Sequence, residues 1–218
     1  MSDQLENNTR RQFMSVVAAN AAMLVAAGCA GNTGVATAAA PANGGAGTNG
    51  ARKFDDSWTR KLGEHRVVFE VNQFNGMPSF AGDLMDSYRE GLGAQDKDMG
   101  FVVVLRHGVV TMAMREQAWQ KYPIGEVLKY NDKDGKPHAV NPYAKTVEKL
   151  LARGVTFLAC NVGLTGASNM IAKHVKADAA DVKADLIAAM YPNVYVQPNG
   201  VYALLRAQNV GCAYYKLS

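Results

Sequence analysis

The chain has 218 residues, of which 48% are hydrophobic and 19% charged, and its formal net charge is +4. This balance is typical of a globular protein with a packed core, and it excludes a wholly disordered chain. Because basic and acidic residues are interspersed, the sequence lacks the basic stripe of nucleic-acid-binding proteins, and no nucleic-acid partner is predicted.

The N-terminal residues have the pattern of an export signal. The stretch "TRRQFMS" places Arg10 and Arg11 before an apolar, alanine-rich run from Met14 to Ala27. This pattern resembles a twin-arginine signal, which a receptor reads and which is not part of the folded domain. The apolar run is short for a transmembrane helix. We therefore predict that residues 1–30 are an export signal and that the protein is periplasmic; the alternative is a cytosolic protein with a basic, apolar first helix.

Two ways of processing this signal remain open. The stretch "AAGC", which ends at Cys29, resembles a lipoprotein box, although Ala26 stands where leucine is usual. Lipidation of Cys29 would anchor the protein to a membrane. Ordinary cleavage near "ATAAAPA" would instead release it.

The segment that follows the signal is expected to be a linker. Residues 31–51, "GNTGVATAAAPANGGAGTNGA", consist mainly of glycine, alanine, threonine and asparagine and carry no charge. Such a segment cannot bury enough apolar surface to become ordered. We therefore expect the folded domain to span residues 52–218.

From residue 65 onward, strand and helix patterns alternate. Apolar and β-branched runs predict five strands, at residues 65–74, 100–108, 155–161, 193–200 and 212–217. Amphipathic spacing, glycines and prolines predict helices at residues 79–93, 109–122, 141–154, 166–175, 181–190 and 201–211. The run "FVVVL" is almost continuously apolar, as in a strand buried on both faces. The order of these segments predicts an α/β domain with a parallel sheet and helices on both faces.

A long polar connection, residues 122–141, joins two of the predicted helices. Long loops in compact domains are often functional or lie at interfaces. This loop carries apolar side chains that need cover, namely those of Tyr122, Ile124, Val127, Leu128 and Tyr130. We predict that a second subunit supplies that cover in a symmetric homo-oligomer.

The predicted sheet defines where a site is expected. In open parallel sheets, ligands bind beyond the carboxyl ends of the strands. Six candidate residues lie at the ends of the first four predicted strands: Asn75, Arg106, His107, Cys160, Asn161 and Asn199. If the second and third strands are neighbours, His107 and Cys160 face each other across one strand spacing. We consider these two residues as catalytic candidates and the other four as substrate-binding candidates.

Cys160 raises the main question, because it ends a strand and precedes a helix. Free N–H groups at a helix start favour the thiolate, which is the nucleophilic form. The alternative is a small, buried and inert cysteine, and position alone does not decide between the two. A reactive Cys160 is expected to be partly exposed.

Cys212 begins the last predicted strand, at the opposite edge of the sheet. The two edges lie about 16–20 Å apart, and a disulfide requires Cα atoms within about 7 Å. We therefore expect no bond between Cys160 and Cys212, and a buried Cys212. The sequence has no CxxC motif, so it supports neither a thioredoxin-type reaction nor a zinc knuckle.

Three segments together resemble the DsrE/DsrF-like sulfur-relay proteins: "FVVVLRHGVVTMAM", "LLARGVTFLACNVGL" and "VYVQPNGVYALLRAQNVGCAYYKL". The resemblance covers residues 65–218. It implies a three-layer α/β/α fold with a five-stranded parallel sheet and assembly as trimers or hexamers. It also implies a cysteine at the position of Cys160 that carries a persulfide between partners. The relay proteins are cytosolic, whereas this chain has an export signal, and its 122–141 segment resembles an exported subgroup.

Three functions follow as hypotheses. In the first, Cys160 takes sulfane sulfur from a donor, His107 relays a proton, and a donor or acceptor protein is the partner; no metal or cofactor is needed. In the second, the protein only binds copper or haem through His107 and methionines, since Met112 and Met114 lie close to it in sequence. Met77, Met85 and Met170 are further candidates, and core packing is the alternative for Met112 and Met114. In the third, the protein is an oligomeric scaffold with an inert thiol.

Overall fold

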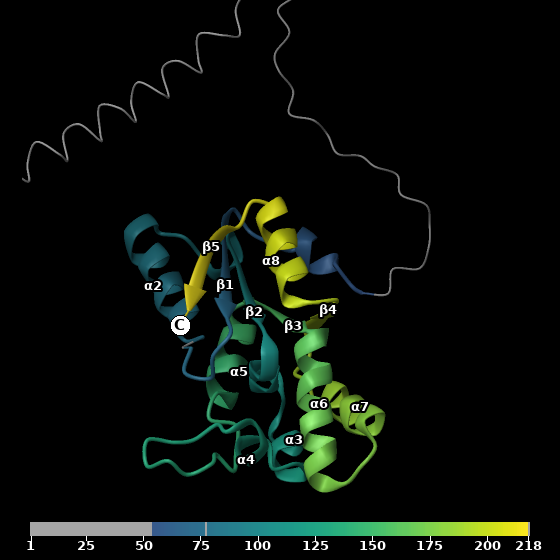
Figure 1. The fold of residues 1–218 in the computed structure, drawn as a ribbon. Coiled ribbons are helices and arrows are strands. Elements are labelled where there is room, and N and C mark those ends of the chain that lie inside the picture. The colour runs from purple at the N-terminus through teal and green to yellow at the C-terminus, as the bar shows by residue number, and fades with distance from the viewer. Residues whose placement is uncertain (1–53, 77, 218) are drawn as a thin grey trace, which may run out of the picture. The chain divides into compact units, whose positions relative to one another are not determined.

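A computed structural model describes residues 54–76 and 78–217 (Figure 1). The predicted export signal, Cys29, the linker and Met77 lie outside the described residues. Among the described residues, no helix is long and apolar enough to cross a membrane.

Five parallel strands form one sheet in the order β4-β3-β2-β1-β5. They are β1 (His65–Val71), β2 (Met99–Leu105), β3 (Thr156–Cys160), β4 (Val194–Gln197) and β5 (Ala213–Leu217). Every residue of β2 and β3 is buried, which explains their nearly continuous apolar sequence. The predicted all-parallel sheet is confirmed.

Helices cover both faces of this sheet. The first face carries α2 (Phe80–Leu92), α5 (Ala144–Ala152), α6 (Asn161–Val175) and α7 (Ala179–Ala188), and the second carries α8 (Gly200–Asn209) and the short 3-10 helix η1 (Ser57–Arg60). Side chains alternate along β1, so that Phe69 lies in the core of the first face and Val68 in that of the second. The predicted three-layer α/β/α architecture is therefore confirmed.

Short elements fill the remaining connections: η2 (Asp96–Asp98), η3 (His107–Ala113), α3 (Glu116–Lys121) and α4 (Ile124–Leu128). The prediction of one helix over residues 109–122 is wrong, because the chain is extended between η3 and α3. There Met114 forms an antiparallel bridge with Met190, and the N–H of Arg115 donates to the carbonyl of Ala189 at 2.8 Å. Three consecutive residues with β-branched side chains at 109–111 also disfavour a regular helix.

The apolar side chains of the 122–141 connection pack against the domain to which they belong. Tyr122 and Ile124 are buried, and the ring of Tyr130 stacks on that of Phe74 with centroids 3.8 Å apart. The buried amide of Asn141 donates to the carbonyls of residues 112 and 114, which ties the end of the loop to the core. The premise that these side chains need a subunit partner is therefore wrong.

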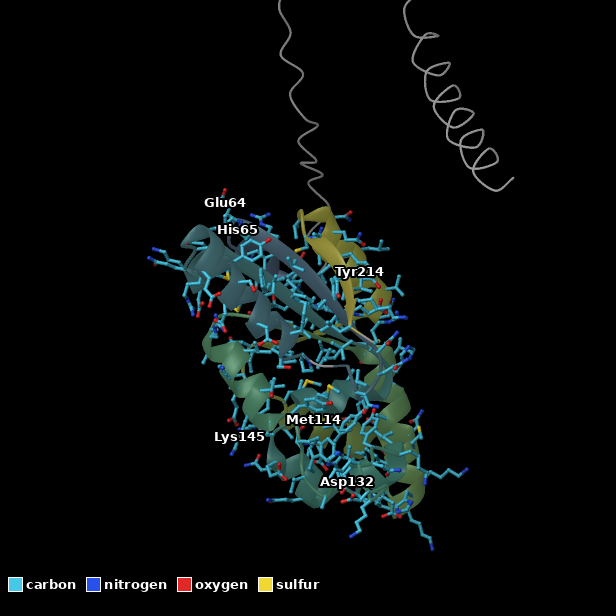
Figure 2. All side chains as sticks on the ribbon, turned by 90° about the vertical axis from the view of Figure 1, so that its left-hand side faces the viewer. Glu64, His65, Met114, Asp132, Lys145 and Tyr214 are labelled. Atoms are coloured by element: carbon cyan, nitrogen blue, oxygen red, sulfur yellow. The ribbon has the colours of Figure 1, made fainter. Side chains whose placement is uncertain are left out.

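Met112 and Met114 are fully buried in the core of the first face. Figure 2 labels Met114. The packing role is therefore the one that the structure supports for them, since their sulfur atoms are sealed from any ligand. Within residues 54–76 and 78–217, no group of three or more His, Cys, Asp or Glu side chains is arranged to hold a metal ion. The metal or haem hypothesis thus loses the pair of methionines that motivated it.

Candidate functional site

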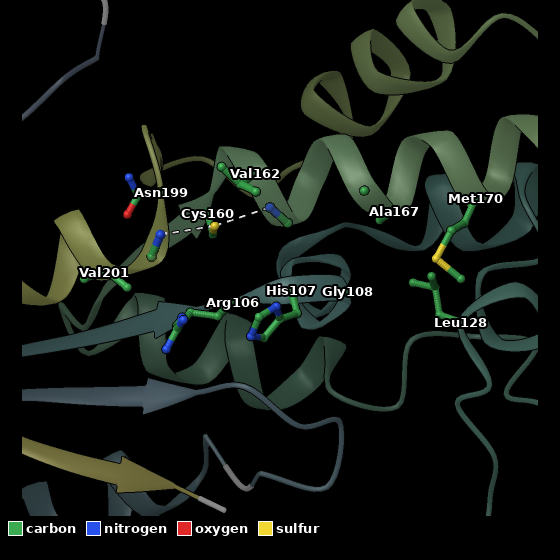
Figure 3. Close-up of a pocket in the computed structure, with 13 residues that line it drawn as sticks. Arg106, His107, Gly108, Leu128, Cys160, Val162, Ala167, Met170, Asn199 and Val201 are labelled. Atoms are coloured by element: carbon green, nitrogen blue, oxygen red, sulfur yellow. Dashed lines mark hydrogen bonds between the residues drawn. The ribbon is translucent and has the colours of Figure 1, made fainter.

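Cys160 is the last residue of β3 and the N-cap of α6, so the strand passes into the helix without a loop. The predicted helix start at residue 166 is wrong for this reason. The N–H of Gly163, in the first turn of α6, donates to the Cys160 Sγ atom at 3.3 Å. The expected contact between the sulfur and the following helix is confirmed (Figure 3).

A second helix start points at the same sulfur. The N–H of Gly200, which begins α8, donates to Cys160 Sγ at 3.1 Å. This contact arises because β4 pairs with β3, with Cys160 opposite Gln197, so the turn after β4 lies beside Cys160. N–H groups and the positive ends of two helices converge on one sulfur, an arrangement that stabilises a thiolate.

Both donor glycines occupy positions that exclude a side chain. A Cβ atom at Gly163 would lie 2.4 Å from the carbonyl oxygen of His107, and one at Gly200 would lie 2.4 Å from Cγ of Arg106. Gly166, one turn further along α6, has no atom within 4 Å of the same position. The close approach of the backbone to Cys160 therefore depends on glycine at 163 and 200.

His107 and Arg106 leave β2 directly beside Cys160. The register pairs Leu105 with Ala159, so the expectation that the second and third strands are neighbours is confirmed. His107 is exposed and adopts a left-handed backbone conformation with φ 52°. Non-glycine residues rarely adopt this conformation, and such outliers concentrate at functional sites. Its position between β2 and the Gly163 turn holds the imidazole at the same cavity as the thiol.

Arg106 is held in place by a buried carboxylate. Its Nη1 donates to Glu70 Oε1, and the hydroxyl of Tyr214 on β5 donates to Glu70 Oε2. Burial alone would raise the pKa of Glu70, but the hydrogen bonds from Tyr214 and Arg106 outweigh it and hold that pKa below its ordinary value. The stem of the clamped Arg106 packs against Gly200, so the ion pair also supports one of the two donors to Cys160.

A cavity of about 550 Å³ opens beside the sulfur. This volume is within the range of small-molecule sites. Its lining residues come from the ends of β2 and β3, from the start of η3 and from α4, α6 and α8: Arg106, His107, Gly108, Leu128, Cys160, Val162, Gly163, Gly166, Ala167, Met170, Asn199, Gly200 and Val201. In Figure 3, Arg106 and His107 lie toward the Cys160 end, and Leu128 and Met170 toward the other.

Four of the six sequence-predicted residues meet at this cavity, namely Arg106, His107, Cys160 and Asn199. The side-chain oxygen of Asn199 accepts the N–H of Tyr202 at 2.8 Å, so its main role is to cap α8.

The other two predicted residues lie elsewhere. Asn161 follows Cys160 but lines a different cavity, with Lys61 and Lys183. Asn75 is exposed, four residues beyond the end of β1, and β2 separates β1 from β3. Two strand spacings amount to roughly 10 Å, too far for a short side chain to share a ligand with Cys160.

The expected exposure of Cys160 is wrong. Cys160 is 6% exposed, the same fraction as Cys212, because the Gly163 and Gly200 turns cover it. The two thiols differ in their surroundings. Cys212 is buried in the apolar core under α8, as expected, and this burial raises its pKa to about 11. Both cysteines are free, so the prediction that they form no disulfide is confirmed.

Sequence reasoning missed several residues that build the site: Gly163, Gly200, Glu70, Tyr214 and the apolar lining of the cavity. A glycine three residues after a strand-ending cysteine was a usable signal, because the third residue of a helix is where an N-cap side chain finds its N–H donor. The order of the strands in the sheet brings three of these residues to the site: Gly200, Glu70 and Tyr214. The sequence pattern does not contain that order.

These features define an all-parallel α/β protein with a thiol-centred cavity at the carboxyl end of its sheet. No family model and no curated protein matches the chain. A solved structure of a protein of unknown function from Methanobacterium thermoautotrophicum is similar at 20% identity, over 70% of this chain and 98% of that chain, with a TM-score of 0.37.

Proposed function

We propose that this protein is an exported DsrE-like sulfur carrier or sulfurtransferase in which Cys160 holds sulfane sulfur as a persulfide. The observation that carries the proposal is the pair of N–H donors, from Gly163 and Gly200, on the Cys160 sulfur. An inert core cysteine needs no such donors, whereas a nucleophilic thiolate is stabilised by them. The resemblance of residues 65–218 to the sulfur-relay proteins supports the same assignment.

The reaction is a transfer of neutral sulfur between two thiols. The Cys160 thiolate attacks the outer sulfur of a donor R–S–SH, the S–S bond of the donor breaks, and R–S⁻ leaves. His107, at the same cavity, gives the leaving thiolate the proton that the Cys160 thiol lost. The products are Cys160–S–SH and R–SH, so no outside oxidant or reductant is required. The second transfer, to an acceptor protein, repeats this step in reverse.

The assay is the mass of the mature protein after exposure to polysulfide. We expect one added sulfur, about 32 Da, that peptide mapping assigns to Cys160 rather than to Cys29 or Cys212. Cys160→Ser is expected to lose the adduct, and Cys212→Ala is expected to keep it. An adduct that survives in Cys160→Ser and maps elsewhere would show that the carrier thiol has been misassigned.

Export by the twin-arginine route is part of the proposal, although its signal lies outside the described residues. We expect that changing Arg10 and Arg11 to lysine leaves the uncleaved precursor in the cytoplasm, because the receptor reads paired guanidinium groups. The measurement is fractionation followed by mass analysis, which also shows whether Cys29 is lipidated. Undiminished periplasmic protein from the double variant would rule out the twin-arginine route.

We also propose that the protein is a symmetric homo-oligomer, a trimer or hexamer. The support is the resemblance to the relay proteins, together with exposed apolar side chains on α6 and α8 outside the cavity, such as Val175 and Leu205. Light scattering at micromolar concentration measures this directly, and a monomer would refute it.

A further inference from the structure

The cavity beside Cys160 is lined mainly by apolar side chains. Val162 and Met170 on α6, Val201 on α8 and Leu128 on α4 are among its lining residues. Three of these apolar side chains are exposed to water rather than packed into either core: Val162 at 63%, Met170 at 51% and Val201 at 51%. Figure 3 shows Met170 and Leu128 at the end of the cavity opposite Arg106. A ligand that fills this space would remove apolar surface from water.

Apart from the imidazole of His107, the main polar groups at the cavity already have partners. The N–H groups of Gly163 and Gly200 donate to the sulfur, and the side-chain oxygen of Asn199 accepts from Tyr202. Arg106 is paired with Glu70, so the two charges cancel.

When Cys160 is ionised for attack, its thiolate adds one negative charge at that end of the cavity. An anionic donor would therefore meet a like charge, and among the residues that line the cavity only a protonated His107 would offer it an unpaired cation. A neutral donor is not repelled by the thiolate and needs no cation to balance its charge. The charge pattern and the apolar walls favour the same class of compound.

We propose that the cavity binds neutral, apolar sulfane-sulfur compounds, of the class R–S–S–S–R with short alkyl groups, in preference to anionic donors. This inference rests on the proposed role of Cys160 and names its substrate class. The Cys160 thiolate attacks the central sulfur, one S–S bond breaks, and the departing R–S⁻ takes up the proton of the original thiol. The Sγ atom of Cys160 then carries –S–S–R, so the sulfane sulfur is held as a mixed trisulfide rather than as –S–SH. The other product is R–SH, and the atoms and electrons balance without a further reagent.

The test compares two trisulfides of equal chain length on the full-length protein. One is dipropyl trisulfide, and the other is the trisulfide of mercaptopropionate, in which a carboxylate replaces each terminal methyl group. Modification of Cys160 is followed by mass spectrometry with peptide mapping, and each rate is divided by the rate with free cysteine to remove intrinsic reactivity. We expect the neutral compound to be favoured by about tenfold or more, as burial of two or so methylene groups provides.

Two surface variants locate the origin of the preference. Met170→Lys places a cation in the cavity wall and is expected to reduce the preference at least about fivefold, through attraction of the carboxylates. Leu92→Lys introduces the same charge at an exposed residue at the end of α2 and is expected to leave it unchanged. Both positions are exposed, so neither variant is expected to unfold the domain.

The possible outcomes distinguish a failure of the proposed substrate class from a failure of the proposed function. If the anionic compound modifies Cys160 as fast as the neutral one, the substrate class is wrong while the carrier role stands. If neither compound modifies Cys160 while polysulfide still does, the substrate class is wrong and the carrier role stands; if polysulfide fails as well, both proposals fail. If Met170→Lys changes the oligomeric state in light scattering and leaves the donor preference intact, the apolar wall is a contact between proteins and the substrate class is overturned.

Discussion

Replacing Gly163 with alanine is expected to destabilise the domain by about 2 kcal/mol, as overpacking of a filled site does, and to slow the reaction of Cys160 with iodoacetamide. The added Cβ would lie 2.4 Å from the carbonyl oxygen of His107, which is backbone and cannot rotate away. Either α6 or the His107 turn must therefore move. Each movement lengthens the N–H to sulfur contact at Cys160 or displaces the imidazole. Urea unfolding measures the first effect, and alkylation followed by peptide mapping measures the second.

Gly91→Ala is the control, because it makes the same change in a helix, α2, that does not line the cavity, at a position where no atom lies within 4 Å. Alanine in a helix interior is better than glycine by roughly 0.5–1 kcal/mol, so this variant is expected to be slightly more stable than the wild type. Its Cys160 is expected to react at the wild-type rate. Equal behaviour of the two alanine variants would contradict the view that the Gly163 turn is built around the thiol.

Glu70→Gln is expected to cost about 3 kcal/mol at neutral pH, as removal of one partner of a buried ion pair does. Glu70 is 5% exposed, and its loss of charge leaves Arg106, with a side chain 24% exposed, without its partner. The hydroxyl of Tyr214 can still donate to the amide oxygen, so the loss comes mainly from the arginine. Because the stem of Arg106 packs on Gly200, we also expect slower alkylation of Cys160.

The stabilisation by Glu70 is expected to depend on pH in a definite direction. The pKa of Glu70 is lower in the folded protein than its ordinary value of 4.5. Its contribution to stability is therefore fully present above about pH 4.5 and is lost as the pH falls through the folded-state value. Wild type and Glu70→Gln should differ most near neutral pH and converge in acid, as measured by urea unfolding at a series of pH values.

Asp185 provides the comparison on the surface, because it also accepts from a basic side chain and a tyrosine hydroxyl, those of Lys121 and Tyr122. The side chains of Lys121 and Asp185 are 59% and 41% exposed, so water screens their attraction. Asp185→Asn is expected to change stability much less than Glu70→Gln and to leave Cys160 alkylation unchanged. If the two variants lost similar stability, burial would not be what makes the Glu70 pair strong.

The fold was largely predictable because its signals are local. The apolar run of β2 predicts a strand buried on both faces, and the alternation of strands and helices predicts a parallel sheet. Where the signal was long-range, the prediction failed. The helix expected over residues 109–122 is interrupted by the bridge between Met114 and Met190, and these residues are far apart in the chain.

The site, like the fold, was predictable where its signals were local. Cys160 ends a strand, Arg106, His107 and Asn199 each follow one, and the sheet brings them together. Asn75 also follows a strand, but the order β4-β3-β2-β1-β5 places β1 away from β3. The same order brings Gly200 to the sulfur, although forty positions separate it from Cys160 in the chain. Strand order depends on the packing of whole elements, and a hydrophobic pattern does not contain it.

The central claim is that the fold is built around the Cys160 thiol, and the two cysteines of the described domain test it against each other. Each is 6% exposed, so exposure alone predicts equal rates of alkylation. The surroundings predict otherwise. Cys160 receives two N–H donors at an open cavity, whereas Cys212, with a pKa raised to about 11, is thiolate in only about one molecule in ten thousand at pH 7.

The decisive measurement is the rate at which iodoacetamide labels each cysteine in the native protein at pH 7, read by peptide mapping. We expect Cys160 to react at least about tenfold faster than Cys212, because only the thiolate attacks. In urea, where both thiols are exposed, the two rates are expected to become similar. If native Cys212 labels as fast as Cys160, or if Cys160 stays unlabelled until the protein unfolds, then Cys160 is a structural cysteine and the sulfur-carrier proposal is wrong.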